Sequence, residues 1–268
     1  MGRVTAVYWP EDGAAAATLA EAAEAAAGWP GIPENWREPI RLIVTGDARR
    51  FDSLTSGRLP EWGIGAAFSA SNTIVLKLKG DVRRTLRHEM AHLALHSVAR
   101  RVPLWFDEGY AARAAGEWSR LQSLRVNWAL LTGVVPELSQ VNTDLRSGPS
   151  HADVAYALAT AAVLLLERMG GERGLEALLV NLAETQDLDR ALRETHQVTL
   201  GQFEVLWQRD IRKRYGWVLL GGSLTVFWTA LAILLLSLWG WRRRRDRLRR
   251  VALDDGWTVP RDEWYPTS

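Results

Sequence analysis

The spacing of apolar and polar residues divides the chain into a strand-rich beginning and a long helical remainder. Short runs typical of strands occupy residues 4–9, 40–45, 64–69 and 73–78, and the turn Ala70-Ser-Asn72 predicts that the last two form a hairpin. Helical patterns occupy 14–27, 81–99, 105–115, 117–132, 152–169, 173–184, 187–195 and 199–214. The Gly- and Pro-broken segments 46–63 and 133–150 are predicted to be loops. Strands followed by helices favour an α+β fold with a small mixed or antiparallel N-terminal sheet.

One segment near the C-terminus, residues 215–241, has no charged side chain. As a helix, its stretch from Trp217 to Trp241 would be about 37 Å long, against roughly 30 Å of hydrocarbon in a bilayer. Tryptophans lie at both ends of this stretch, where indole rings favour the membrane interface. The pattern predicts one transmembrane helix over 215–241, and the alternative is a helix buried in a protein core.

The cationic residues on either side of this segment predict its orientation. Seven arginines within 242–250 outnumber the four cations within 209–214, so the positive-inside rule places the tail 242–268 in the cytoplasm. Residues 1–214 then form an extracytoplasmic domain of a single-pass cell-membrane protein. The alternative to this orientation is that residues 1–214, with any functional site they carry, face the cytoplasm. Residues 1–10 contain no apolar segment long enough for a signal peptide, so either a leader is missing or removed, as we expect, or the helix inserts unaided with its N-terminus outside.

Composition narrows the range of functions. The tail 242–268 holds eight cationic and five acidic residues. The rest of the chain therefore holds 25 cationic and 26 acidic residues. A domain so close to neutral is not typical of a nucleic-acid binder. The sequence has no cysteine, which excludes a disulfide scaffold, a thiolate metal site and a cysteine nucleophile.

The clearest chemical signal is the run His88-Glu89-Met90-Ala91-His92, which fits the motif H-E-x-x-H. Histidines four residues apart share one face of a helix, so both imidazoles can bind one ion. Imidazole nitrogen suits Zn²⁺. Glu89 lies about 100° further around the helix, where it can reach a water bound to the metal. The alternative is a surface helix on which the histidines are incidental.

A catalytic zinc site needs a third protein ligand, and three residues are candidates. His96 lies about 12 Å along the helix axis from His88, too far to share one ion, so we expect it to support the site or to pack. Asp107 and Glu108 begin a second predicted helix, which can return antiparallel and present a carboxylate to the ion. Gly109 would allow a close backbone approach beside the site.

The motif and the run Trp105-Phe-Asp-Glu-Gly-Tyr-Ala111 together resemble the gluzincin metallopeptidases, in particular the peptidase MA-like proteins, which are often membrane-anchored. The likeness extends over about residues 1–214 and implies a zincin-like domain. It implies Glu108 as the third zinc ligand. It further implies that Tyr156, on a later helix, donates a hydrogen bond to the oxyanion, with His151 as a weaker alternative. The strand at Gly65-Ala66-Ala67 is implied to bind peptide through its main chain.

These features predict a membrane-anchored zinc peptidase that acts on peptides or proteins. Zn²⁺ held by His88, His92 and Glu108 would activate a water, with Glu89 as general base. One alternative is a catalytically silent, membrane-tethered domain that binds a metal or a partner. Another is a regulatory protein whose arginine-rich tail binds anionic lipid.

Overall fold

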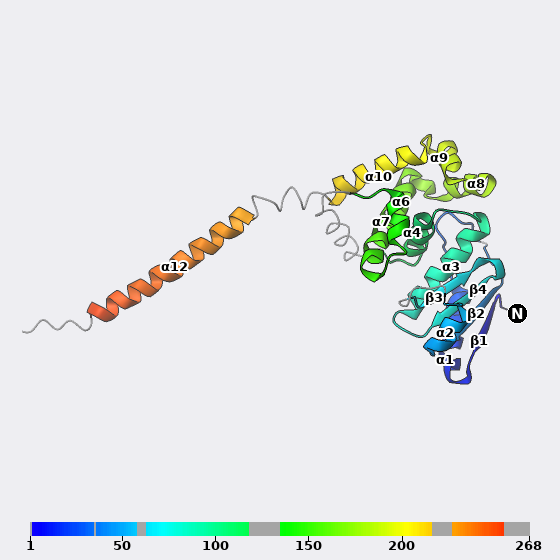
Figure 1. The fold of residues 1–268 in the computed structure, drawn as a ribbon, viewed down its shortest axis with the longest axis horizontal. Helices are drawn as coiled ribbons and strands as arrows, with labels where there is room; N and C mark the ends of the chain where they lie inside the picture. The colour runs from blue at the N-terminus through cyan, green and yellow to red at the C-terminus, as the bar shows by residue number, and fades with distance from the viewer. Residues whose placement is uncertain (1, 35, 58–62, 118–134, 216–226, 255–268) are drawn as a thin grey trace, which may run out of the picture. The chain divides into compact units, whose positions relative to one another are not determined.

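The computed structural model describes residues 2–34, 36–57, 63–117, 135–215 and 227–254. The chain forms two compact units, Met1–Gly216 and Trp217–Ser268. Figure 1 traces the first unit from its strands through the helices that follow, and the described part of the second unit as one long helix.

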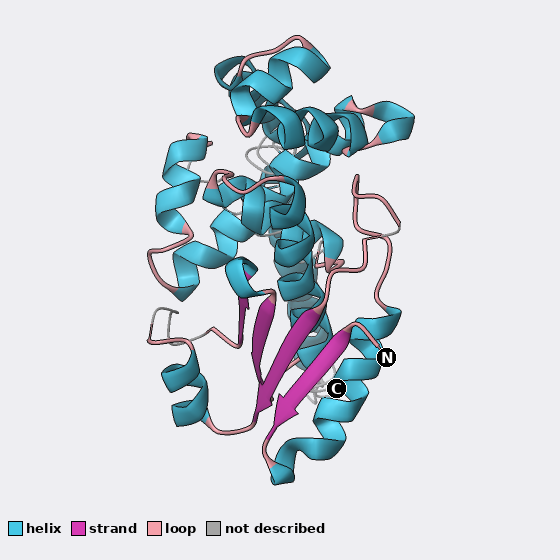
Figure 2. Ribbon diagram, turned by 90° about the vertical axis from the view of Figure 1, so that its right-hand side faces the viewer, coloured by secondary structure: helices cyan, strands magenta, loops and turns pink. Residues whose placement is uncertain are grey.

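A mixed sheet of four strands forms one end of the first unit (Figure 2). The strands are β1 (Val4–Tyr8), β2 (Ile40–Thr45), β3 (Gly65–Phe68) and β4 (Thr73–Lys77), in the order β1-β2-β4-β3. The strands β1, β2 and β4 run parallel, whereas β3 is antiparallel to β4 and occupies one edge. The predicted hairpin is therefore confirmed, and Asn72 closes it in the left-handed region at φ 46°. The α+β fold and the mixed sheet are confirmed with it.

Two helices connect the parallel strands. Helix α1 (Gly13–Ala25) follows β1 and buries Ala16, Leu19 and Ala23. Helix α2 (Ala48–Leu54) follows β2 and lies in a segment predicted to be a loop, so that prediction is wrong there. The Asp47 side chain caps α2 by accepting from the amides of the next two arginines, and Phe51 is 1% exposed. Seven residues with one buried side chain are too few to show a helical period in the sequence.

The described remainder of the first unit is mostly helical. Its helices are α3 (Val82–Val98), α4 (Leu104–Ala114), α6 (Leu138–Asp144), α7 (Pro149–Met169), α8 (Glu176–Thr185), α9 (Leu188–His196) and α10 (Leu200–Tyr215). All of these helices except α6 match a predicted helix to within a few residues, and so does α1. The helix predicted at 117–132 lies almost wholly outside the described residues. The loop predicted at 133–150 is wrong over α6, where Leu138 and Val141 are buried.

Helices α4 and α7 pack closely, and a glycine permits this. A Cβ atom on Gly109 would lie 2.5 Å from the carbonyl oxygen of Ala159 and 2.9 Å from a methyl group of Val163. One turn further along, Arg113 forms a two-pronged ion pair with Glu167, at 2.8 Å for each contact. The expected close approach at Gly109 is therefore present, and its neighbour is the backbone of α7.

We expect Gly109→Ala to destabilise the protein because the added methyl group meets backbone, which cannot move aside. Overpacking of this kind costs about 1–3 kcal/mol, which lowers the melting temperature by about 2–4 °C per kcal/mol. Thermal unfolding followed by circular dichroism measures the change. Gly201→Ala in α10 is the control, since a Cβ there meets only one side-chain atom, at 3.9 Å. Equal melting temperatures for the two variants would contradict the prediction.

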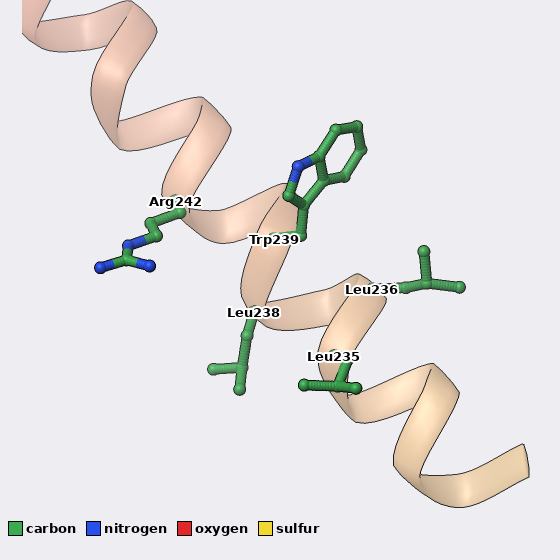
Figure 3. A pocket seen from close by; sticks show the side chains of 5 residues that line it. All are labelled: Leu235, Leu236, Leu238, Trp239 and Arg242. Carbon is green, nitrogen blue, oxygen red and sulfur yellow. The ribbon is translucent and has the colours of Figure 1, made fainter. Parts of the chain in front are cut away.

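The second unit contains helix α12 (Phe227–Asp254). Most of the large apolar side chains within 227–241 are exposed, and Figure 3 shows four of them, together with Arg242, projecting from several sides of the helix. Among the described residues, none of the helices combines the length and the apolar character that crossing a membrane requires. The predicted transmembrane segment 215–241 includes residues 216–226, which lie outside the described residues. The membrane anchor and its orientation therefore stay predictions from the sequence.

Candidate metal centre

Helix α3 positions the H-E-x-x-H motif. Asp81 caps its first turn by accepting from the amide of Arg84. One face of α3 is apolar, and its residues Leu86, Met90 and Leu93 are at most 2% exposed. The histidines lie on another face, one turn apart, with their ring centroids 4.9 Å from each other. Burial of the apolar face therefore determines which way the imidazoles point.

Glu108, in the first turns of α4, meets both histidines. Its Oε2 atom lies 3.3 Å from Nε2 of His88 and 3.8 Å from Nε2 of His92. One ligand atom from each of the three residues lies within 4.8 Å of the others. The structure thus brings together the three ligands predicted from the sequence. Two imidazole nitrogens and one carboxylate oxygen are a donor set that suits Zn²⁺.

The other ring nitrogen of each histidine faces a second carboxylate. Nδ1 of His88 is 3.0 Å from Oε1 of Glu117, and Nδ1 of His92 is 2.6 Å from Oδ1 of Asp107. An ionised carboxylate only accepts, so each Nδ1 carries a proton and donates it. In the neutral imidazole the lone pair is then on Nε2, the atom that faces Glu108. Such carboxylate partners are typical of histidines that bind zinc.

Asp107 and Glu108, which the sequence alone did not separate by role, have different surroundings. Asp107 lies between His92 and His96, whose Nε2 atom is 2.9 Å from its Oδ2. His96 therefore contacts a neighbour of the predicted ligands, as expected for a supporting residue. His92, His96 and Asp107 also form a second group with metal-ligand spacing in the described part of the chain. His92 and His96 each form a hydrogen bond with Asp107, and these two bonds explain why the three residues lie close together.

Glu117 was missed in the sequence analysis. It follows α4 in a helix-ending turn in which Gly116, at φ 69°, is left-handed. The amide of Glu117 donates to the carbonyl of Ala112, and that of Gly116 to the carbonyl of Arg113. These two bonds define a Schellman motif, which turns the chain back toward His88. A glycine just past a predicted helix was the available signal, but it does not show where the next side chain points.

Glu89 lies in a buried position beside the sheet. Its residue is 8% exposed, and burial raises the pKa of its carboxyl group. A Cβ atom on Gly65, the first residue of β3, would lie 2.5 Å from Oε1 of Glu89. The carboxylate thus occupies space that a side chain at position 65 would fill. This places the residue predicted as the general base between helix α3 and the edge strand β3.

Tyr156 reaches the same site from α7. Burial, the negative charges of Glu108 and Glu89, and a hydrogen bond to Glu108 all raise the pKa of its hydroxyl group. The hydroxyl therefore keeps its proton and can donate it in a hydrogen bond. His151, the weaker alternative, is exposed in the first turn of α7.

The acidic neighbours dominate the electrostatics of the histidines. Burial by itself lowers the pKa of His92, but the charge and the hydrogen bond of Asp107 outweigh it and raise the pKa to about 9. Burial also opposes protonation of His88, whose hydrogen bonds to Glu108 and Glu117 raise its pKa well above the usual value. The same pairing lowers the pKa of Asp107 and of Glu108 despite their burial. The metal-free site therefore holds protons at neutral pH.

Zinc binding at pH 7 is expected to release at least one proton, because the metal needs neutral imidazole. The pKa of His92 is raised from 6.5 to about 9. Protonation of His92 therefore stabilises the folded protein fully below pH 6.5, and this stabilisation is lost as the pH rises through 9. The metal-free protein should thus lose stability over this window, while zinc affinity rises about tenfold per pH unit for each proton released. Calorimetric titration in two buffers of different ionisation enthalpy counts the protons. A count of zero at pH 7 would contradict the expectation.

The α+β domain thus brings two histidines of an H-E-x-x-H helix to a glutamate from the next helix, a group that could hold a metal ion. The profile of the Peptidase MA superfamily matches residues 32–213, more than half of the chain. The protein is therefore a member of the Peptidase MA superfamily, and this membership suggests a metallopeptidase. A search of curated proteins finds no match.

Proposed function

We propose that the protein is a zinc-dependent peptidase of the gluzincin type. The observation that carries this proposal is the meeting of the two Nε2 atoms with the carboxylate of Glu108, beside the buried Glu89. Superfamily membership supports the same reaction class. The substrates are peptides or proteins.

His88, His92 and Glu108 would hold the ion. When bound there, zinc supplies a Lewis acid that activates water as a nucleophile and polarises a carbonyl oxygen. The protein orients the two imidazoles through Glu117 and Asp107, so the ligand geometry is largely set before the ion binds.

Glu89 moves the proton in the proposed reaction. Its burial raises the pKa of the carboxyl group toward the working range of a general base. The carboxylate takes a proton from the attacking water and passes it to the nitrogen of the leaving amine. Neither Glu108 nor Glu117 can take this role, because each is engaged by a histidine.

The edge strand β3 supports peptide as the substrate class. It lies at the end of the sheet, next to Glu89 through Gly65. A peptide that pairs with the free edge of β3 would gain main-chain hydrogen bonds without a requirement for particular side chains. Gly65, Ala66 and Ala67 are small, which leaves room for such a peptide.

Tyr156→Phe is expected to lower kcat by about 10²–10³-fold, the usual effect of losing one oxyanion donor. The phenol keeps its proton, so it can donate to the carbonyl oxygen as negative charge develops. KM should change little, since the ring stays in place, and zinc content is determined on the same sample because the lost hydroxyl is also a hydrogen-bond partner of Glu108. Steady-state kinetics on a fluorogenic peptide separates kcat from KM. An unchanged kcat would remove Tyr156 from the reaction.

The proposal is tested with the full chain, purified and loaded with one equivalent of zinc. We expect one tightly bound zinc per protein, cleavage within a peptide library, and loss of cleavage on chelation that zinc restores. Zinc binding with no cleavage of any peptide in a broad library would instead favour a silent metal-binding domain. Cleavage that survives complete removal of metal would exclude the proposed chemistry.

A further inference from the structure

The two histidines of the centre are held by different arrangements. Among the described residues, Glu117 is the one that faces Nδ1 of His88, and its side chain is 23% exposed. His92 is held through a chain of two hydrogen bonds, from Nδ1 to Asp107 and from Nε2 of His96 to the other oxygen of the same carboxylate. The distances are 2.6 Å and 2.9 Å. His96 is therefore connected to the metal centre without being close enough to His88 to join it.

The carboxylate of Asp107 has both oxygens occupied by different donors. Because a carboxylate only accepts, Nε2 of His96 must carry a proton in this contact. Both donors come from α3, one turn apart, whereas Asp107 comes from α4. Because the planar carboxylate of Asp107 accepts a hydrogen bond at each oxygen, it cannot rotate about its side-chain torsion without breaking one of the two hydrogen bonds. The contact from His96 thus fixes the direction from which Asp107 approaches His92.

We propose that His96 is a positioning residue that acts on His92 through Asp107 and raises the affinity of the centre for zinc. The inference rests on the proposed function, in which His88, His92 and Glu108 bind the ion. With His96 in place, the ring of His92 keeps Nε2 directed at the point that Glu108 also faces. Without it, Asp107 is free to turn, and the ring of His92 turns with it.

A purely structural role is the competing explanation, since the contact also ties α3 to α4. Two substitutions separate the explanations. His96→Phe keeps an aromatic ring but removes the donor, while His96→Gln keeps an N–H donor of similar reach. His196→Phe on α9 is the matched control, because Nε2 of His196 is buried without a hydrogen-bond partner in the described part of the chain.

The full-chain variants are titrated with Zn²⁺ against a chromophoric chelator, and zinc loss to excess chelator is timed. We expect His96→Phe to weaken zinc binding by about tenfold, within the 10–100-fold range for partners of metal ligands. His96→Gln and His196→Phe should stay within about twofold of the unchanged protein. The visible spectrum of the Co²⁺-loaded protein should shift in His96→Phe and be restored in His96→Gln, a change that a loss of stability alone does not produce.

A double-mutant cycle with Asp107→Asn tests the route of the effect and covers the case in which one variant folds poorly. If His96 acts through Asp107, the double variant binds zinc no more weakly than Asp107→Asn alone. Additive losses would overturn the proposed route. Equal zinc affinity in His96→Phe and the unchanged protein, or equal losses in the Phe and Gln variants, would overturn the positioning role.

The outcomes also distinguish this inference from the proposed function. An unchanged protein that binds zinc and cleaves peptide, with His96→Phe indistinguishable from it, defeats the inference alone. A protein that binds zinc but never cleaves defeats the proposed function, while the zinc affinities still decide on His96. A protein that binds no zinc overturns both.

Discussion

Replacement of Glu89 by Gln is expected to leave zinc bound and to lower peptide hydrolysis by about 10²–10⁴-fold, the usual contribution of a general base. Gln has nearly the same shape, so the crowded space beside Gly65 stays filled. It has no carboxylate, so no group at this position can take the proton from the attacking water. The loss should appear in kcat, since neither a ligand nor a substrate contact is removed.

The measurement is kcat on a fluorogenic peptide, with zinc content determined on the same sample. Glu21→Gln, on the exposed side of α1, is the matched control and should keep full activity. Full activity in a zinc-loaded Glu89→Gln protein would show that the proton is carried elsewhere and would defeat the proposed mechanism. Loss of zinc in this variant would instead show that Glu89 helps to hold the ion.

The second large effect is expected from His92→Ala, which should weaken zinc binding by more than about 100-fold. That figure is the upper end of the range for partners of metal ligands, and His92 is proposed as a ligand itself. The variant removes one of three ligand atoms, and it also leaves Asp107 without one of its two hydrogen-bond donors. Hydrolysis should fall with the zinc content.

Competition titration with a chelator of known affinity measures the loss. His196→Ala, on α9, removes a histidine from elsewhere in the domain and should bind zinc as the unchanged protein does. Unaltered zinc affinity in His92→Ala would place the ion away from His88, His92 and Glu108. Together the two experiments separate the residue proposed to move a proton from one proposed to bind the metal.

Local patterns were sufficient to predict the sheet strands, the helix that carries the H-E-x-x-H motif and its two histidines, whereas Glu108 was singled out only by the resemblance to a known family. A motif with spacing of four residues specifies one helix face, so His88 and His92 could be placed together from the sequence. Strand β3 and the turn that follows it could also be predicted, because their pattern lies within a short stretch of neighbouring residues. The α+β class followed from the order of these elements along the chain.

What the sequence did not predict depends on contacts between elements. Asp107 and Glu108 are adjacent, and their different roles follow from the angle at which α4 meets α3. Glu117 depends on the path of the chain after Gly116. Helices α2 and α6 are seven residues each, too short for a periodic pattern, and each is stabilised by burying one or two side chains in a core that only the folded chain provides.

Within the described residues, helix α4 and the turn that ends it carry the three carboxylates that contact the histidines of α3. Asp107 and Glu108 lie near its start and Glu117 just beyond its end. Adding or deleting one residue between them would rotate one end against the other by about 100°, so Glu117 would leave His88 while Glu108 stayed in place. The centre therefore constrains the length of a helix as strictly as the identity of its side chains, and insertions are tolerated only outside 107–117.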